Sequence, residues 1–388
     1  MDDIKRVQLS EIVEVVTKGT TPTTLGYEFQ DEGVNFLKIE CFDENGGFIE
    51  SKVAHISEEC QKKMKRSQLK NGDILFSIAG AIGRVAIVTE EMLPANINQA
   101  LAIIRISDEQ VYLPYIKLIL TSPIVIEQFE RKKQGVAQLN LSLKDINEIS
   151  IPLPGKDKQI ELAELFDKVV GVISKRNKEL SALDDLIKAR FVEMFGDPVL
   201  NPLGWDVKPV IDICDCMVPG RDKPKSFTGA IPWITIDDLI VNSTTFRSKQ
   251  GLGLTEAEIG EVKRKTIPVG SVVMSCVGNF GICSIAGNEM IINQQLHSFQ
   301  CHSEINNVFL MYYLGQRKDY MEKQASSTTV LYMNKSVCNS IPVIIPDLEL
   351  QEQFALFVNQ VNKSKVKVQK ALDETQKLFD SLMQQYFG

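Results

Sequence analysis

The chain carries the same pattern of residues twice. Residues 77–83, SIAGAIG, return as residues 275–281, SCVGNFG, with every serine and glycine in the same place. Residues 97–99 and 292–294 both read INQ, and the spacing from Pro154 to Gln159 returns from Pro346 to Gln351. A period of about 195 residues indicates a duplicated domain, because solenoid repeats are only 20–50 residues long. Two similar modules on one chain can bind a target that itself has two parts.

The composition indicates a globular protein. Hydrophobic residues make up 44% of the chain and charged residues 24%, and no run approaches the 18 apolar residues that a membrane span needs. The eight cysteines follow neither a disulfide framework nor a paired CxxC spacing, and the first residues lack the apolar core of a signal peptide. We therefore expect a cytoplasmic protein with no membrane partner.

The net charge of −7 argues mildly against a free-standing nucleic-acid binder, since phosphate contacts demand a basic surface. Basic residues nevertheless cluster at 62–66, 131–133 and 263–265. Each cluster is more often a solvated face than a DNA contact.

Each half is expected to begin with a mixed segment of helices and strands. Strand-like runs lie at 34–39, 73–78 and 84–88, and a helix is expected over 112–132 with a counterpart over 308–324. Each segment ends on an apolar strand that runs into Pro154 or Pro346. The fold class is therefore α+β: two similar mixed α/β domains separated by a long antiparallel two-helix coiled coil, with a pseudo-two-fold internal repeat.

A long helix is expected to follow each mixed segment, because 156–196 and 347–388 contain no interior proline. Apolar residues recur there in three- and four-residue steps, as in a coiled-coil seam. The predicted seam residues are Phe166, Val169, Ile173, Leu180, Leu183 and Ile187 in the first helix, and Val358, Val361, Val368, Leu372, Phe379 and Leu382 in the second. The alternative is two amphipathic helices, each packed on its own domain.

Connectivity then predicts the order of the parts. The first helix leads from one module to the other, so a second helix that pairs with it must run back antiparallel. The expected boundaries are a first domain at 1–155, a central helix at 156–197, a second domain at 198–346 and a C-terminal helix at 347–388.

This layout resembles the specificity subunit of type I restriction-modification systems over essentially the whole chain. The resemblance rests on Pro154 and Gln159 with their repeats, on the Ser-x-x-Gly-x-x-Gly and Asn-Gln elements, and on the Phe-Gly after each long helix. The family element GDIL is present at 72–75, whereas 270–273 reads GSVV and departs from it.

The resemblance implies two target recognition domains that each read one half of a split DNA sequence, across a spacer set by the helices. It implies double-stranded DNA, two methyltransferase subunits and two restriction (nuclease and translocase) subunits as partners. It also implies that this chain is not an enzyme and binds no cofactor. S-adenosylmethionine, ATP and magnesium would be used by the partners.

Catalytic motifs are missing from the sequence. There is no Gly-x-x-x-x-Gly-Lys-Ser/Thr for ATP and no Asn/Asp-Pro-Pro-aromatic tetrapeptide of an aminomethyltransferase. A zinc cluster of His297, Cys301 and His302 is conceivable, but a plain strand end is the preferred interpretation, so no metal site is predicted. Three rival functions are a lone methyltransferase or nuclease, a scaffold of two protein-binding modules that does not bind DNA, and a specificity subunit of a solitary methyltransferase.

DNA contacts are expected from loops that carry hydroxyls, amides and cations. In the first module the candidates are Lys18, Thr20, Thr21, Thr23, Lys62, Lys63, Lys65, Arg66, Asn98, Gln99, Arg131, Lys132, Lys133 and Gln134. In the second module they are Arg221, Lys223, Lys225, Lys263, Arg264, Lys265, Asn293, Gln294, Lys323, Gln324, Ser326 and Thr328. The repeated glycines at 80, 83, 278 and 281 are interpreted as backbone constraints such as a positive φ. The pair of long helices is expected to be the docking platform for the methyltransferase subunits, and it carries these acidic residues outside its seam: Glu161, Glu164, Glu179, Asp184 and Asp185.

Overall fold

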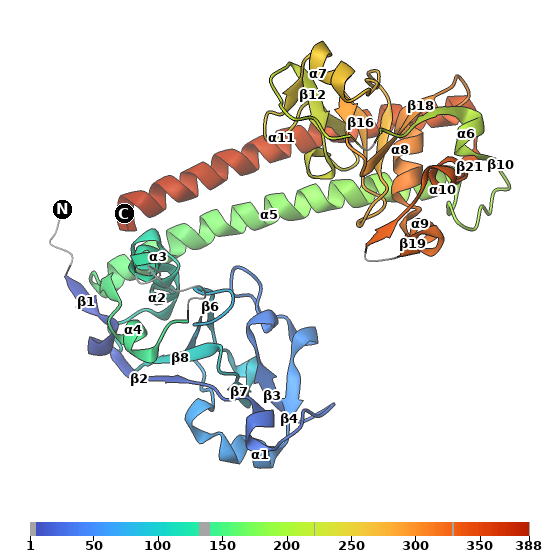
Figure 1. Cartoon of the computed structure of the whole chain (residues 1–388). Helices are drawn as coiled ribbons and strands as arrows, with labels where there is room; N and C mark the ends of the chain where they lie inside the picture. The colour runs from blue at the N-terminus through green and yellow to red at the C-terminus, as the bar shows by residue number, and fades with distance from the viewer. Residues whose placement is uncertain (1–4, 132–139, 221, 328–329, 388) are drawn as a thin grey trace. The chain divides into compact units, whose positions relative to one another are not determined.

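One main sheet, antiparallel except for a parallel edge strand in the second half, forms the centre of each half of the chain in the computed structural model, which describes residues 5–131, 140–220, 222–327 and 330–387 (Figure 1). The chain divides into two compact units: unit 1 comprises Met1–Asn177 and Lys370–Gly388, and unit 2 comprises Lys178–Gln369. Each long helix is thus shared between the two units, whereas the sequence-based boundaries placed each helix in a segment of its own.

Unit 1 contains three sheets. The main sheet has the order β2 (Val13–Lys18), β8 (Leu101–Ile106), β5 (Ile74–Ser77), β6 (Val85–Ile87). The second sheet has the order β4 (Ala54–Ile56), β3 (Val34–Leu37), β7 (Ala95–Ile97), and β1 (Arg6–Gln8) pairs with β9 (Ser150–Pro152). The short helices are α1 (Glu58–Lys63), α2 (Leu113–Leu120), α3 (Pro123–Glu130) and α4 (Leu143–Asn147). Single turns of 3-10 helix lie at Leu9–Glu11, Pro22–Leu25, Ile39–Cys41, Glu50–Lys52, Lys65–Ser67 and Glu90–Met92.

Unit 2 repeats this plan. Its main sheet has the order β11 (Cys214–Met217), β18 (Leu296–Cys301), β15 (Val272–Ser275), β16 (Cys283–Ala286), β13 (Thr244–Thr245). The smaller sheets are β14 (Gly253–Leu254), β12 (Ile231–Ile234), β17 (Ile291–Ile292); β10 (Asp206–Pro209) with β21 (Pro342–Ile345); and β19 (Ser326–Ser327) with β20 (Leu331–Tyr332). The short helices are α6 (Val210–Ile213), α7 (Glu256–Glu261), α8 (Asn307–Gly315), α9 (Lys318–Gln324) and α10 (Lys335–Asn339), with a 3-10 turn at Ile236–Asp238.

The central strand β5 is buried throughout because both faces of its sheet are covered. Side chains of a strand alternate between the two faces. Ile74 and Phe76 lie in a core with Tyr115 of α2, whereas Leu75 lies in a separate core with Leu37 of the second sheet. The sheet is therefore held between the helices on one side and the smaller sheet on the other.

Two helices expected to be continuous are broken. The helix predicted over 112–132 is two helices, because Pro123 begins α3 and a proline inside a helix removes a hydrogen bond and clashes with the preceding turn. The helix predicted over 308–324 is interrupted between Gly315 and Lys318. There the buried Arg317 donates from Nη1 to the carbonyl of Pro198, 2.9 Å away.

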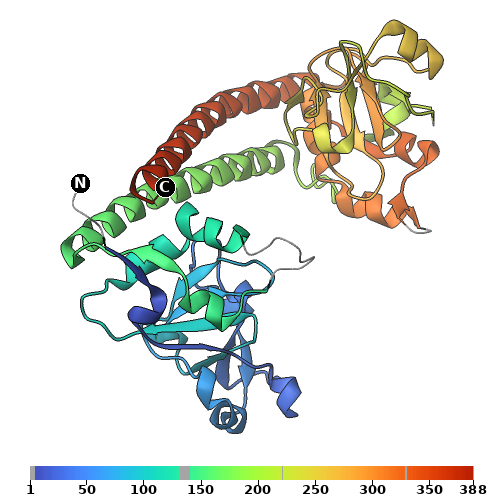
Figure 2. The ribbon, with the colours of Figure 1, turned by 60° about the vertical axis from the view of Figure 1, so that its left-hand side comes forward.

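The two long helices are α5 (Lys156–Phe195) and α11 (Leu348–Phe387), of 40 residues each. In unit 1 the start of α5 packs on the end of α11, where the ring centroids of Phe166 and Phe379 are 5.6 Å apart (Figure 2). In unit 2 the end of α5 packs on the start of α11, with Phe191 and Phe354 5.4 Å apart. The helices therefore run antiparallel where they pair in each unit. All twelve predicted seam residues are buried or half-buried.

One acidic residue lies elsewhere than expected. Asp184 was placed outside the seam, but its carboxylate is half-buried and lies 2.6 Å from Nζ of Lys365 on α11. Lys365 occupies a position that follows the apolar spacing of the second helix. Asp184 on α5 is therefore the ion-pair partner of Lys365 in the seam, and its carboxylate is not available to a docked subunit.

The repeated proline–glutamine motif ties each long helix to its module. Gln159 donates from Nε2 to the carbonyl of Pro154 (2.8 Å) and accepts from the amide of Tyr112 (2.8 Å). Gln351 donates to the carbonyl of Pro346 (2.8 Å) and accepts from the amide of Asn306 (2.8 Å). Both glutamines are buried, so each amide satisfies backbone groups that would otherwise lack partners.

The repeated Phe-Gly motif closes the two units in the same way. Phe195 at the end of α5 lies in the core of unit 2, and Phe387 at the end of α11 lies in the core of unit 1. Gly196 follows with a φ of 78°, a conformation that favours glycine at the end of a helix. Unit 1 is therefore completed by the last turns of the second long helix.

Candidate nucleic-acid interface

Three loops of unit 1 meet at one edge of its main sheet. Strand β2 ends where β8 begins, since Lys18 pairs with Ala102, and β8 begins where β5 ends, since Leu101 pairs with Ser77. The loop after β2, the turn before β8 and the loop after β5 therefore lie side by side. We call this edge, with residues 18–25, 98–100 and 78–84, the loop edge of unit 1.

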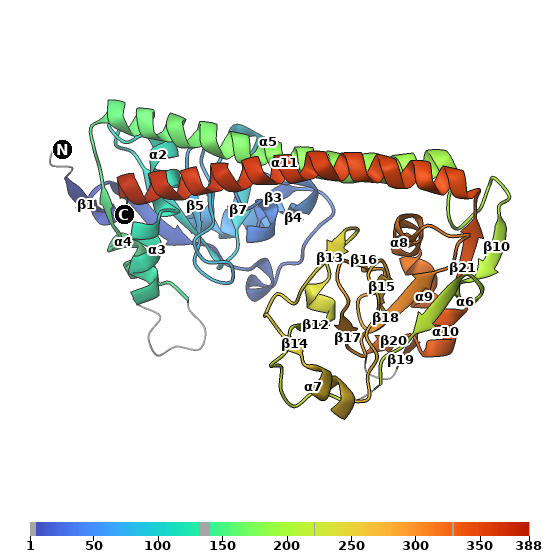
Figure 3. The same ribbon diagram turned by 90° about the horizontal axis from the view of Figure 1, so that it is seen from above.

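Unit 2 has a corresponding loop edge. Met217 at the end of β11 pairs with Ser298 near the start of β18, and Leu296 at that start pairs with Ser275 at the end of β15. The described segments that meet there are 218–220 with 222–230, 293–295 and 276–282. The β19–β20 hairpin joins them, because the amide of Gly278 donates to the carbonyl of Leu331 at 2.8 Å (Figure 3).

The predicted residues Thr21 and Gln99 come together at the loop edge of unit 1. The Thr21 hydroxyl donates to Oε1 of Gln99. The loop is held against the turn at Gly19, where an added Cβ would lie 2.0 Å from the carbonyl oxygen of Ile97. Only glycine allows this approach, so Gly19 positions the threonines beside the glutamine.

The two residues of each Asn-Gln pair have different roles. Oδ1 of Asn98 accepts from the amide of Ala100 at 3.2 Å, and Oδ1 of Asn293 accepts from the amide of Gln295 at 3.0 Å. These asparagines thus shape the same turn in both units. Gln99 and Gln294 are exposed at the tips, so the glutamines are the members of the pairs that can reach a ligand.

The remaining candidates fall into three groups. Exposed residues of the loop edges and their hairpin are Lys18, Thr23, Lys223, Lys225 and Ser326, together with Lys323 and Gln324 at the end of α9; Thr20 is half-buried. Exposed cations beyond the loop edges are Lys62, Lys63, Lys65, Arg66, Lys263 and Lys265, which lie on or just after α1 and α7, and Arg131 after α3. Lys132, Lys133, Gln134, Arg221 and Thr328 lie outside the described residues.

Arg264 is a correction to the predicted phosphate contacts. Its side chain is buried, with the guanidinium 4.7 Å from the ring centroid of Trp233. Nη2 donates to the carbonyl of Asp222 (2.6 Å) and Nη1 to that of Ile292 (2.9 Å). Burial lowers the pKa of this guanidinium. Arg264 therefore holds the lysine-bearing loop 222–225 beside the 293–295 turn and is not available to phosphate.

The interpretation of the repeated glycines as backbone constraints is confirmed. Gly80 and Gly83 have φ of 73° and 88°, and Gly278 and Gly281 have 74° and 78°. The serine of each motif closes the loop: Ser275 donates to the carbonyl of Asn279 (2.6 Å) and accepts from the amide of Ile282 (3.2 Å).

The sequence analysis did not name the exposed residues at the loop tip and hairpin of unit 2, which are Asn279, Val330, Leu331 and Tyr332. Only the strand pairing shows that these segments meet.

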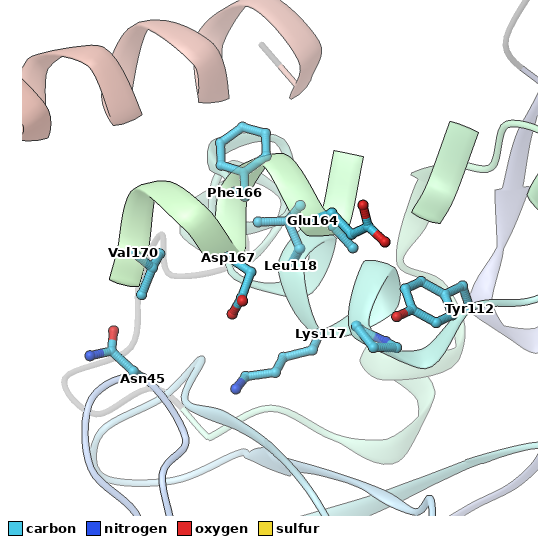
Figure 4. A pocket seen from close by; sticks show the side chains of 10 residues that line it. Asn45, Tyr112, Lys117, Leu118, Glu164, Phe166, Asp167 and Val170 are labelled. Atoms are coloured by element: carbon cyan, nitrogen blue, oxygen red, sulfur yellow. The ribbon is translucent and has the colours of Figure 1, made fainter. Parts of the chain in front are cut away.

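A separate cavity of about 380 Å³ lies in unit 1 between α2, α5 and the segment that includes Asn45. Figure 4 shows Lys117, Asp167 and Asn45 pointing into the same space. Burial lowers the pKa of Lys117, and the carboxylates of Asp43 and Asp167 oppose this effect. The cavity shares no residue with the loop edge.

The conceivable zinc ligand His297 is part of the core. It is buried on β18, with Nδ1 2.9 Å from the carbonyl of Met217 and Nε2 3.0 Å from Oδ1 of Asn339. Among the residues that the structure describes, no three His, Cys, Asp or Glu side chains are grouped to hold a metal ion. Burial lowers the pKa of His297 to about 4.

This pKa predicts a pH dependence of stability. The unfolded chain takes up a proton near pH 6.5, whereas folded His297 does so only near pH 4, so stability is fully present above pH 6.5 and is lost as the pH falls towards 4. The loss should reach about 3 kcal/mol. Urea unfolding of a His297→Gln variant should lack this contribution, whereas His302→Gln, an exposed control, should keep it. Equal pH profiles for wild type and His297→Gln would contradict the assignment.

The described residues form no helix long and apolar enough to cross a membrane. Two units of one α+β plan, each with a loop edge of amides, hydroxyls and lysines, define a duplicated recognition protein. The family model for the type I restriction modification DNA specificity domain matches residues 1–182 and 202–375. The chain therefore belongs to this family of type I specificity proteins.

Similar proteins carry the same description. The chain is 30% identical over 171 residues to the type I restriction enzyme EcoBI specificity subunit of Escherichia coli. This match covers 42% of this chain and 35% of the relative. It is 24% identical over 383 residues to a putative MjaX specificity subunit of Methanocaldococcus jannaschii, covering 90% and 84%. The specificity subunit structure from M. genitalium has a TM-score of 0.55 at 13% identity, covering 99% of this chain and 96% of that one. A chain solved in a study of type I restriction-modification assembly has a TM-score of 0.58 at 18% identity, covering 98% and 95%, and both structures share the fold.

Proposed function

We propose that the chain is the DNA-recognition subunit of a type I restriction-modification complex, in which each unit reads one half of a bipartite target. The observation that carries the proposal is the loop edge, which recurs on the same backbone frame with different side chains. Unit 1 presents Thr21 and Gln99, whereas unit 2 presents Gln294 beside Lys223 and Lys225. Amides and hydroxyls read base edges, and lysines bind phosphates without reading sequence.

The chemistry is assigned to partners. Two methyltransferase subunits would methylate adenine with S-adenosylmethionine, and two restriction subunits would use ATP and magnesium to translocate and cleave DNA. This chain would have no catalytic role, which the lack of a phosphate-binding loop and of a methyltransferase tetrapeptide in its sequence supports. The long helices would dock the methyltransferase subunits and set the spacer between the half-sites.

The net charge of −7 fits an assembly in which the partners supply much of the phosphate-binding surface. The chain alone should then bind DNA weakly and with a strong dependence on salt.

The experiment that tests the proposal is methylome sequencing of a methylation-free host that expresses this chain with its neighbouring methyltransferase. We expect methyladenine in a split motif, in both half-sites, because each unit reads its own half. Hosts that express either protein alone are the controls and should show no such modification. Modification by this chain alone would reveal a catalytic site, and a stable complex without modification would favour the non-DNA scaffold. Neighbouring reading frames distinguish a full restriction system from a solitary methyltransferase.

A further inference from the structure

Three consecutive apolar side chains are exposed at the loop edge of unit 2. Val330 is 52% exposed, Leu331 38% and Tyr332 40%, and all three lie on or next to strand β20 of the hairpin. Leu331 and Tyr332 are neighbours on β20 and point to opposite faces, so Val330 and Tyr332, two residues apart, are the pair that can share a surface. Apolar side chains exposed together, instead of singly, mark a surface that meets a ligand or partner.

The backbone beneath these side chains is held in place. The amide of Met333 donates to the carbonyl of Cys276 at 2.9 Å, and the Met333 side chain is buried. Together with the bond from Gly278 to Leu331, this attaches the hairpin to the glycine loop on both sides of Tyr332. The apolar residues cannot turn inward without breaking these bonds.

The surroundings of the apolar residues are polar and cationic. Lys323 and Gln324 precede the hairpin, and Asn279 stands at the tip of the glycine loop that it pairs with; all three are exposed. A surface for an apolar protein partner would not need such groups around it, whereas DNA presents phosphates beside its base edges.

Unit 1 has a polar residue at the matching place. The amide of Leu141 donates to the carbonyl of Ile78 at 3.0 Å, as that of Met333 does to Cys276. The residue before Leu141 is the exposed Asn140, in the place of Tyr332. The position before this hydrogen-bonded residue is therefore aromatic in unit 2 and polar in unit 1.

We propose that Val330 and Tyr332 read thymine in the half-site of unit 2 through its 5-methyl group. This proposal rests on the proposed function. A valine side chain cannot hydrogen-bond to a base, and the thymine methyl is the apolar feature that base pairs display in the major groove. Unit 1 carries the polar Asn140 in the place of Tyr332, and an asparagine would contact a base by hydrogen bonds.

The test replaces single thymines by deoxyuracil, which removes only the methyl group. The full chain in complex with its methyltransferase is titrated with duplexes that carry the target found by methylome sequencing, and thymines of both half-sites are replaced in turn. We expect at least one replacement to weaken binding roughly fourfold, the effect of losing one buried methyl group. In the variant Val330→Gln/Tyr332→Asn that replacement should change affinity less than about 1.5-fold.

Val269→Gln is the matched control. Val269 is 65% exposed in the same unit and lies before β15, at the opposite edge of the sheet. This variant should keep the fourfold effect. The proposal is overturned if no uracil replacement weakens binding, or if the double variant keeps the full effect of every replacement that does. If the double variant assembles less well with the methyltransferase and its remaining complex keeps the uracil effect, the surface binds a protein partner and the proposal is overturned. Failure of the proposed function would give a different binding result, because the wild-type complex would then bind all duplexes with no sequence preference.

Discussion

Replacing Asp73 by serine should destabilise the chain by about 3–5 kcal/mol, the cost of leaving one partner of a buried ion pair alone. Asp73 is 1% exposed, and its two carboxylate oxygens each lie 2.7 Å from a nitrogen of Arg105. The hydrogen bond with Asp73 raises the pKa of Arg105. An arginine is charged at neutral pH even without a partner, so removing Asp73 leaves an unpaired charge at a half-buried position. The free energy of unfolding, measured in urea, reports this loss.

The repeat supplies the rescue variant. Unit 2 has Ser271 and Gln300 at the matching positions, and Nε2 of Gln300 donates to Oγ of Ser271 at 3.3 Å. A double variant Asp73→Ser/Arg105→Gln should therefore recover to within roughly 1 kcal/mol of wild type, because no buried charge remains. Glu161→Ser breaks an exposed pair with Lys158 of equal length, 2.7 Å, and should cost under about 1 kcal/mol. A double variant no more stable than the single would refute the exchange.

Replacing Arg264 by methionine should cost roughly 3 kcal/mol and loosen the lysine loop of unit 2, because two backbone carbonyls lose a charged donor and Trp233 loses its stacked cation. Urea unfolding measures the first effect. Limited trypsin digestion measures the second, through faster cleavage after Lys225.

Arg66→Met is the matched control. Arg66 precedes Arg264 by 198 residues, as Gly80 precedes Gly278, but its side chain is exposed. It should change the free energy of unfolding by less than about 0.5 kcal/mol. If Arg264→Met were as stable and as resistant to trypsin as Arg66→Met, the positioning role of Arg264 would be wrong.

The duplication, the α+β class and the two long helices follow from the sequence alone, because repeats, proline positions and apolar spacing are local signals. The repeat also identifies Gln159 and Gln351 as motif residues. It does not predict that both amides are buried and satisfy backbone groups. The sequence also shows that Ser271 replaces the aspartate of the GDIL element in the second module. It does not show that Gln300 is the partner of Ser271, because this contact depends on the pairing between β15 and β18.

Tertiary structure alone decided which loops meet and which cations are free. Arg66 and Arg264 are alike in sequence, but only Arg264 has Trp233 and two carbonyls around it. The loop edges arise from antiparallel pairing of strands that are distant in the chain. The sequence does not indicate that Val330 to Tyr332 lie beside the glycine loop, because the hydrogen bonds that place the hairpin there join distant segments. Local pattern determines the elements, whereas burial and long-range pairing determine what each side chain can touch.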